Sequence, residues 1–242
     1  TRWLNVTGVQ TCALPILAVV TGGSRGIGAA VVEHLTQDGY EVVFTYVSAH
    51  AEAEAVTART GADGVRVDLA DSGAAKAFAA ELEARRPGLL VNNAALAEGE
   101  AERVWQVCYR TPLLLTRAFA EAGALEAVVN VGSMNAVRGS GGGLDYTGAK
   151  AALLGLTRGL AAELAPAVRV NAVIPGIIDT AMNDRHRGEG FDDLIARGVP
   201  LGRLGRPDEV ADAICWLLGA SYVTGVELAV DGGALMRFPL VR

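Results

Sequence analysis

The stretch LAVVTGGSRGIG, residues 17–28, joins an apolar run, a glycine-rich turn and the start of an amphipathic segment. The apolar run followed by glycines predicts a buried strand that ends in a tight turn. Gly22, Gly26 and Gly28 let the backbone come close to a pyrophosphate, whose charge is favoured by the N-terminus of the following helix. An ordinary strand-to-helix turn is the alternative, but the strand before the glycines and the helix after them favour a dinucleotide site.

Short apolar runs and longer amphipathic stretches alternate along the rest of the chain. We expect strands at residues 17–21, 41–46, 64–67, 89–92, 125–131, 168–174 and 226–230. Helical segments between the strands predict parallel β-α-β units, because right-handed crossovers pass over one face of the sheet or the other. The expected fold class is α/β, a single Rossmann-type, doubly wound parallel sheet of about seven strands with helices on both faces.

Composition limits the classes of partner. The chain of 242 residues is acidic, with a net charge of −6 and a pI near 5.1, so nucleic acid and anionic membrane surfaces are poor partners and small molecules remain. Cys12, Cys108 and Cys215 lack the spacing of a metal site or a disulfide framework, which favours a reducing, cytoplasmic location and no bound metal. No apolar run approaches the roughly 18 residues of a membrane span.

Residues 6–16, VTGVQTCALPI, resemble a translated sequencing adapter. We therefore expect residues 1–16 to be a non-native leader and residues 17–242 to form one domain, since single sheet-centred domains commonly reach this size. A natural leading strand is the alternative for the leader.

DYTGAK, residues 145–150, places Tyr146 and Lys150 four positions apart, with Ser133 upstream. Residues four apart share one face of a helix, so the Lys150 ammonium can reach towards the Tyr146 phenol and favour its phenolate. Each residue could also have no catalytic role: Tyr146 as a half-buried helix residue, Lys150 as a solvated cation and Ser133 as a loop hydroxyl. The three together indicate proton-transfer chemistry.

The tip of the second expected strand bears on the choice of nucleotide. An acidic residue there would bind the ribose hydroxyls of NAD, but this chain has Tyr46, Val47 and Ser48. Arg25 in the glycine loop could bind a 2′-phosphate bidentately, and Ser48 and His50 could add hydrogen bonds. We expect NADP, with NAD less favoured; a solvated Arg25 is the alternative.

These motifs resemble the short-chain dehydrogenase/reductase family, in the branch of 3-oxoacyl-[acyl-carrier-protein] reductases. The markers are TGGSRGIG at 21–28, VDL at 67–69, NNAA at 92–95, Ser133, Tyr146 with Lys150, PGIIDT at 175–180 and VDGG at 230–233. The resemblance implies the following cofactor-binding residues: Gly22, Ser24, Arg25, Gly26, Ile27, Gly28, Ser48, Asp68, Leu69, Asn92, Ala94, Tyr146, Lys150, Pro175, Gly176, Ile178 and Thr180.

The resemblance also implies a reaction. Hydride passes between nicotinamide and a carbonyl or alcohol substrate, Tyr146 donates the proton, Ser133 holds the oxygen, and Lys150 assists Tyr146 and binds the ribose. The substrate could be a 3-oxoacyl thioester on acyl carrier protein, towards which Arg185 and Arg187 give a weak hint. A non-catalytic NADP-binding regulatory protein with the same fold is the competing hypothesis.

Further expectations concern single segments of the chain and its assembly. Cys108 stands where the family has an asparagine that helps to return protons to the lysine, and the segment between NNAA and Cys108 is compressed. Residues 140–143, SGGG, suggest a mobile loop, and residues 182–199 a helical lid over the substrate. The resemblance implies a homotetramer joined through residues 104–121 and 145–164, although packing within one subunit would explain the same apolar faces.

Overall fold

The computed structural model describes residues 15–140, 143–184 and 188–236. Most of the predicted leader lies outside the described residues. So do Gly141 and Gly142 of the expected mobile loop, and Arg185 and Arg187 of the expected lid.

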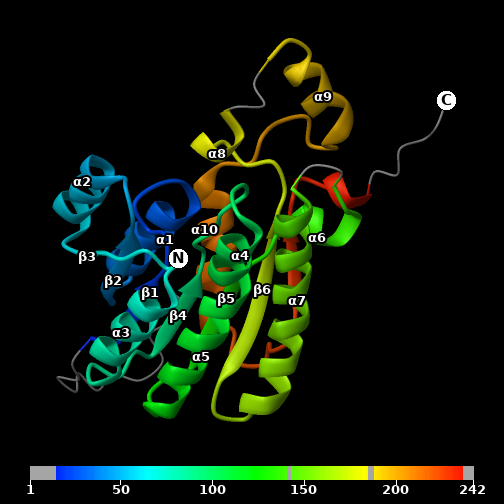
Figure 1. Cartoon of the computed structure of the whole chain (residues 1–242). Coiled ribbons are helices and arrows are strands. Elements are labelled where there is room, and N and C mark those ends of the chain that lie inside the picture. Colours follow the sequence, from blue (N-terminus) through cyan, green and yellow to red (C-terminus); the bar gives the residue numbers. More distant parts are fainter. Residues whose placement is uncertain (1–14, 141–142, 185–187, 237–242) are drawn as a thin grey trace.

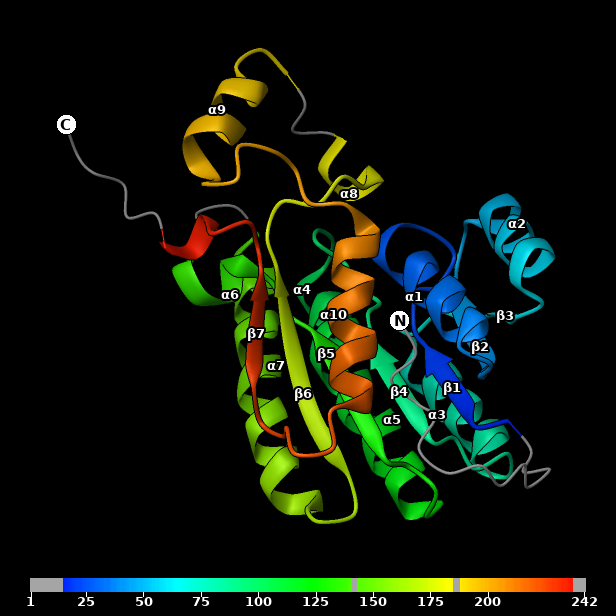
Figure 2. The ribbon, with the colours of Figure 1, turned by 180° about the vertical axis from the view of Figure 1, so that it is seen from behind.

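Seven parallel strands form one sheet in the order β3-β2-β1-β4-β5-β6-β7 (Figures 1 and 2). The strands are β1 Leu17–Val20, β2 Glu41–Tyr46, β3 Asp63–Arg66, β4 Leu89–Asn92, β5 Ala127–Val131, β6 Arg169–Pro175 and β7 Glu227–Val230. Each lies within two residues of its expected range, because central parallel strands are short apolar runs that stand out from their amphipathic neighbours. The predicted fold class is confirmed.

Helices cover both faces of the sheet. They are α1 Gly26–Gln37, α2 His50–Thr60, α3 Ser72–Glu83, α4 Ala101–Trp105, α5 Thr111–Glu121, α6 Met134–Arg138, α7 Leu144–Leu164, α8 Ala181–Asp184, α9 Phe191–Gly198 and α10 Pro207–Gly219. A π-helical turn, η1 Gln106–Arg110, joins α4 to α5, and a short 3-10 turn, η2 Ala234–Met236, follows β7. Figure 1 shows α3, α5 and α7 over one face, and Figure 2 shows α1 and α10 over the other.

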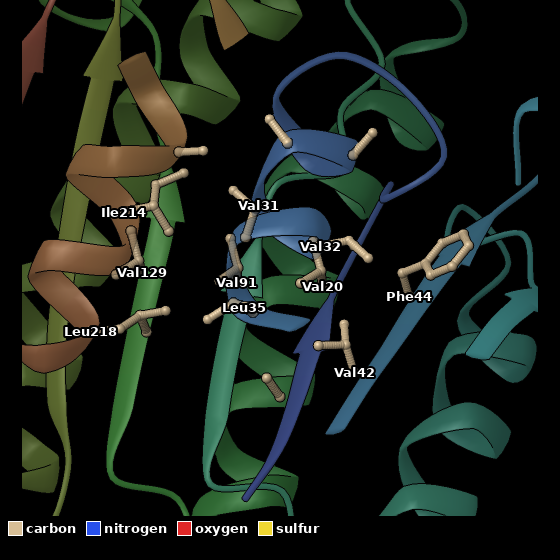
Figure 3. Packing of buried hydrophobic residues seen from close by; sticks show 14 of the residues in the cluster. Val20, Val31, Val32, Leu35, Val42, Phe44, Val91, Val129, Ile214 and Leu218 are labelled. Atoms are coloured by element: carbon tan, nitrogen blue, oxygen red, sulfur yellow. The ribbon is translucent and has the colours of Figure 1, made fainter. Parts of the chain in front are cut away.

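Two apolar layers hold these helices to the sheet. Val31 and Leu35 of α1 and Ile214 of α10 pack on Val91 and Val129 of the central strands (Figure 3). A second cluster fills the opposite face, where α3, α5 and α7 contribute Phe78, Phe119 and Leu160. Successive strand residues point to opposite faces, so both layers are built from the same strands.

The strand order reverses between β1 and β4, which are neighbours in the sheet. At such a switch point the two connections leave in opposite directions, and the carboxyl ends of the strands form a ligand crevice. The loop after β1 and the segment after β4 therefore line the same site. In the part of the chain that the structure describes, no helix is long and apolar enough to cross a membrane.

Candidate active site

The loop between β1 and α1 has the glycines that its geometry demands. Gly22 and Gly26 have φ values of +68° and +56°, which side chains rarely adopt. A Cβ at Gly28 would lie 2.1 Å from the carbonyl oxygen of Gly22. The loop is tied to β2, because the Gly22 N–H donates to the Thr45 hydroxyl at 3.0 Å and the Gly23 N–H donates to the Thr45 main-chain oxygen at 2.9 Å. The first N–H groups of α1 have no acceptor within the helix and suit an anion. Ser24 is buried and Ile27 is half-buried in the same loop.

Residues after β4 brace this loop from the other side of the switch point. The Asn93 Nδ2 donates to the carbonyl oxygens of Thr21 and Gly22, each at 2.9 Å. The Thr21 hydroxyl accepts from the main-chain N–H groups of Asn93 and Ala94, each at 3.0 Å. Asn93 was not predicted from the sequence, although it is the second asparagine of NNAA and stands between the predicted residues Asn92 and Ala94.

Asn92, the first asparagine of NNAA, faces the core. Its side chain is 2% exposed, and its Nδ2 donates to Asn130 Oδ1 at 2.8 Å. Asn130 in turn donates to the Thr157 hydroxyl at 2.9 Å, which links β4, β5 and α7. Any cofactor contact at Asn92 would thus come from its main chain, and Ala94, half-buried beside the glycine loop, lies nearer the crevice.

From the sequence, the nucleotide is expected at the tip of β2, which lies beside β3. Arg25 and Ser48 are exposed there, and His50 meets the Tyr46 ring edge-on with 5.3 Å between ring centres. The Asp68 carboxylate accepts from Arg103 Nη2 of α4 at 2.9 Å and from the Ala70 N–H at 2.9 Å.

The Arg103 hydrogen bond, reinforced by that of Ala70, lowers the pKa of Asp68 below its usual range. Leu69 is buried beside it. Arg103 was not among the predicted residues; it lies in α4, 35 positions after Asp68.

Ser133, Tyr146 and Lys150 meet at the carboxyl end of β5. Lys150 is 1% exposed, and its Nζ donates to the main-chain oxygen of Val131, the last residue of β5, at 2.6 Å. The same Nζ lies 5.9 Å from the centre of the Tyr146 ring. Ser133 follows Val131 by two residues and caps α6, its hydroxyl oxygen accepting from the Asn135 N–H at 3.2 Å. Lys150 therefore links Tyr146 of α7 to the end of β5, two residues before Ser133.

Cys108 is buried behind this point. Its Sγ lies 3.7 Å from the carbonyl oxygen of Leu96, and it packs with Val104 and Ala149. It sits in the π-helical turn η1, and Pro112, four residues later, has no N–H to donate to its carbonyl. The helical segment over residues 101–121 therefore changes from α-helical to π-helical geometry next to the site.

The segment after β6 closes the crevice against the glycine loop. A Cβ at Gly26 would lie 3.1 Å from Thr180 Cγ2, so the two predicted residues face each other. A Cβ at Gly176, which follows Pro175 at the end of β6, would lie 2.7 Å from Asp231 Cα, which explains the glycine there. Ile178 is buried, and its carbonyl accepts from Asn183 Nδ2 at 2.7 Å.

The short helices α8 and α9 stand beyond this end of the sheet (Figures 1 and 2). Ile195 of α9 is buried with Met134 of α6 and Val199, so the segment packs against α6. Its role as a lid over the substrate stays a prediction. Among the residues described, no three His, Cys, Asp or Glu side chains gather where a metal ion could be held.

Comparison with known proteins agrees with this geometry. A family model described as Enoyl-(Acyl carrier protein) reductase matches residues 22–234. Carbonyl reductase family member 4 of Danio rerio is 38% identical over 236 residues, which cover 90% of this chain and 97% of the relative. The chain belongs to the short-chain dehydrogenase/reductase family.

Membership of the short-chain dehydrogenase/reductase family makes the chain an oxidoreductase, which confirms the prediction of an enzyme. The 3-oxoacyl-[acyl-carrier-protein] reductase FabG of Pseudomonas aeruginosa is 35% identical over 243 residues, covering 91% of this chain and 97% of the relative, and supports the predicted branch. A blue fluorescent protein from a metagenomic library, solved in complex with NADPH, has a TM-score of 0.82 and 34% identity, covering 90% of this chain and 97% of that chain.

Proposed function

We propose that this protein reduces a ketone to a secondary alcohol with NADPH. The observation that carries the proposal is Lys150: an ammonium that is 1% exposed, held by the Val131 carbonyl and placed beside the Tyr146 ring. Burying a cation without a carboxylate partner is costly, so such a residue needs a functional reason. Of its three N–H donors, one is used by Val131, which leaves others for ribose hydroxyls.

The chain fits a dinucleotide at the crevice. A side chain at Gly28 would collide with the Gly22 carbonyl, so the glycines keep the loop close to α1. The N-terminus of this helix favours a pyrophosphate. The tip of β2 carries no acid to repel a 2′-phosphate, and Arg25 and Ser48 are exposed beside it. The similar solved structure that holds NADPH supports the same preference here.

When bound, the reduced nicotinamide supplies the hydride. As the carbonyl carbon receives it, Tyr146 gives its hydroxyl proton to the carbonyl oxygen, so that the ketone becomes a secondary alcohol. Lys150 stabilises the phenolate that remains. The Ser133 oxygen accepts from Asn135, and no described residue accepts its O–H, so this hydroxyl can donate to the substrate oxygen and hold it against Tyr146.

For the substrate we propose a 3-oxoacyl thioester, carried on acyl carrier protein. The elements around the mouth of the crevice expose apolar side chains that suit an acyl chain. Val137 of α6 is 53% exposed, Leu144 of α7 73% and Leu194 of α9 60%. The likeness to a 3-oxoacyl-[acyl-carrier-protein] reductase supports the same class.

Three further proposals concern the whole chain. Residues 17–242 form the domain, a homotetramer is its working state, and the cytoplasm is its location, as the cysteine pattern favours. The main-chain oxygen of Ile16 accepts from the Glu41 N–H at 3.1 Å, so a protein without the leader is best begun before Ile16.

The test is NADPH oxidation by the leader-free protein against 3-oxoacyl thioesters and simple ketones. Tyr146→Phe should lower turnover about a hundredfold or more, the usual contribution of a positioned proton donor, while NADPH still binds. Tyr222→Phe, at a fully exposed tyrosine, is the matched control and should change nothing. Tight NADPH binding without turnover on any substrate would instead favour a regulatory protein.

A further inference from the structure

Arg66 is held across the tip of β2. It is the last residue of β3 and lies opposite Tyr46 in the parallel register. Its side chain is exposed, and its Nε donates to the main-chain oxygen of Val47 at 3.1 Å. This bond ties the guanidinium to the first residue beyond β2, where the ribose of a bound dinucleotide is read.

The remaining donors of Arg66 are available. Within the described residues, its terminal nitrogens Nη1 and Nη2 have no hydrogen bond or ion pair. A guanidinium carries five N–H groups, and only the one on Nε is used. The other four lie in the planar fork that matches the oxygens of a phosphate.

Carboxylates near Arg66 along the chain are already paired with other arginines. Asp63, at the start of β3, lies 3.6 Å from Arg85. Asp68, two residues after Arg66, lies 2.9 Å from Arg103. The tip of β2 adds no acid, so the charge of Arg66 is left to face an anion from solution.

We propose that Arg66 determines the preference for NADPH by binding its 2′-phosphate together with Arg25 and Ser48. The inference rests on the proposed use of NADPH. In the sheet, β2 lies between β3 and β1, so Arg66 flanks its tip on one side and the loop of Arg25 on the other. Two arginines from separate elements thus lie on the two sides of the segment after β2, in which Ser48 is exposed.

Calorimetric titration tests the proposal with two pairs of ligands, NADPH with NADH and adenosine 2′,5′-bisphosphate with 5′-AMP. Within each pair only the 2′-phosphate differs. Arg66→Leu should weaken NADPH and the bisphosphate about tenfold, as expected for a charge-assisted hydrogen bond, and leave NADH and 5′-AMP unchanged. Arg66→Lys keeps the charge but loses the fork, so it should show a smaller loss of the same kind.

Arg59→Leu is the matched control. Arg59 is paired with Glu33 and lies in the last turn of α2, just before the amino-terminal end of β3, whereas the tip of β2 lies at the carboxyl ends of the strands. Arg59→Leu removes the same charge and should leave the affinity for all four ligands unchanged. If Arg66→Leu lowers the affinity for both ligands of a pair equally, or lowers neither, the role of Arg66 is overturned while the use of NADPH stands. A parent protein that does not prefer NADPH to NADH would overturn both.

Discussion

Cys108 packs behind the candidate active site. Its thiol is 1% exposed and reaches only the Leu96 carbonyl, at 3.7 Å, where an amide would offer both a donor and an acceptor. It packs against Ala149, the neighbour of Lys150. We infer that the return of protons to Lys150 is slower with this thiol than with an asparagine.

Cys108→Asn should therefore raise proton-limited turnover roughly fivefold, the effect of about one net hydrogen bond. The measurement is steady-state turnover in light and heavy water. Turnover limited by proton transfer is slower in heavy water, and this difference should shrink in the asparagine variant if proton transfer no longer limits the rate. Cys108→Ala removes the thiol without adding an amide and should give no gain. An asparagine variant that is no faster than the parent would count against this account.

The residues of the site differ in how readily the sequence indicates them. Tyr146 and Lys150 are four positions apart, and the glycines of the first loop follow a strand, so helix and turn geometry predict both groups. No regular spacing in the sequence connects Asn93, Arg66 or Arg103 to the residues that they contact. Asn93 reaches back 72 and 71 positions to Thr21 and Gly22, and such contacts follow from strand order and side-chain rotamers rather than from spacing.

At the scale of elements, Arg169 holds the end of α10. It begins β6, and its guanidinium donates to the carbonyl oxygens of Leu217 and Ala220 at 2.9 Å each, and also to that of Leu218. The last carbonyls of a helix have no partner within the helix, so this side chain satisfies groups that would otherwise be buried and unpaired. Burial lowers the pKa of Arg169 below its ordinary value.

Arg169→Met should lower the free energy of unfolding by about 2 kcal/mol, because it leaves these carbonyls without a donor. Urea unfolding of the variant and the parent measures the difference. Arg169→Lys retains one charged donor and should lose less. A methionine variant as stable as the parent would mean that water replaces the guanidinium at no cost.

The start of α10 carries a second arginine contact. Glu209 accepts from Arg203 at 2.7 and 2.8 Å and from the main-chain N–H of Arg206 at 2.8 Å. The Arg203 hydrogen bond, followed by that of Arg206, lowers the pKa of Glu209 from 4.5 to about 2.

Because this pKa is depressed in the folded state, the contact stabilises the fold fully above the ordinary carboxyl pKa and is lost as the pH falls towards 2. An NMR titration of the Glu209 carboxyl should show a midpoint near 2, and Arg203→Met should move it back towards 4.5. A midpoint that Arg203→Met leaves in place would show that Arg203 is not the cause.

At the scale of the whole molecule, the alternation of strands and helices predicted the sheet, since each β-α-β unit has its own apolar period. It did not predict the interruption at η1 Gln106–Arg110, where a π-helical turn bends the segment beside Cys108. Pro112, which has no N–H for the Cys108 carbonyl, is a local signal of that turn, but the apolar period alone does not reveal it.

Assembly is the remaining prediction at this scale. Gly155 and Gly159 of α7 are exposed, and a Cβ at either would meet nothing within 4 Å, so this face admits close approach of another helix. Light scattering should give four times the 25.0 kDa mass of the chain. Gly155→Glu on this face should lower that mass. Ala58→Glu, at an exposed position of α2, is the control and should leave the mass unchanged. A monomer mass for the parent protein would contradict the predicted homotetramer.

The brace between Asn93 and the glycine loop ties the first strand to the fourth across the switch point. Neither half of the crevice exists in a chain that has folded only as far as β3, since the loop then lacks its support. Cofactor affinity therefore reports on completed folding, and by linkage a ligand present at about 100 times its Kd would add about 2.7 kcal/mol to the stability of the folded state. For this enzyme, the supply of nicotinamide nucleotide in the cell would then govern how long each molecule survives proteolysis as well as how fast it turns over.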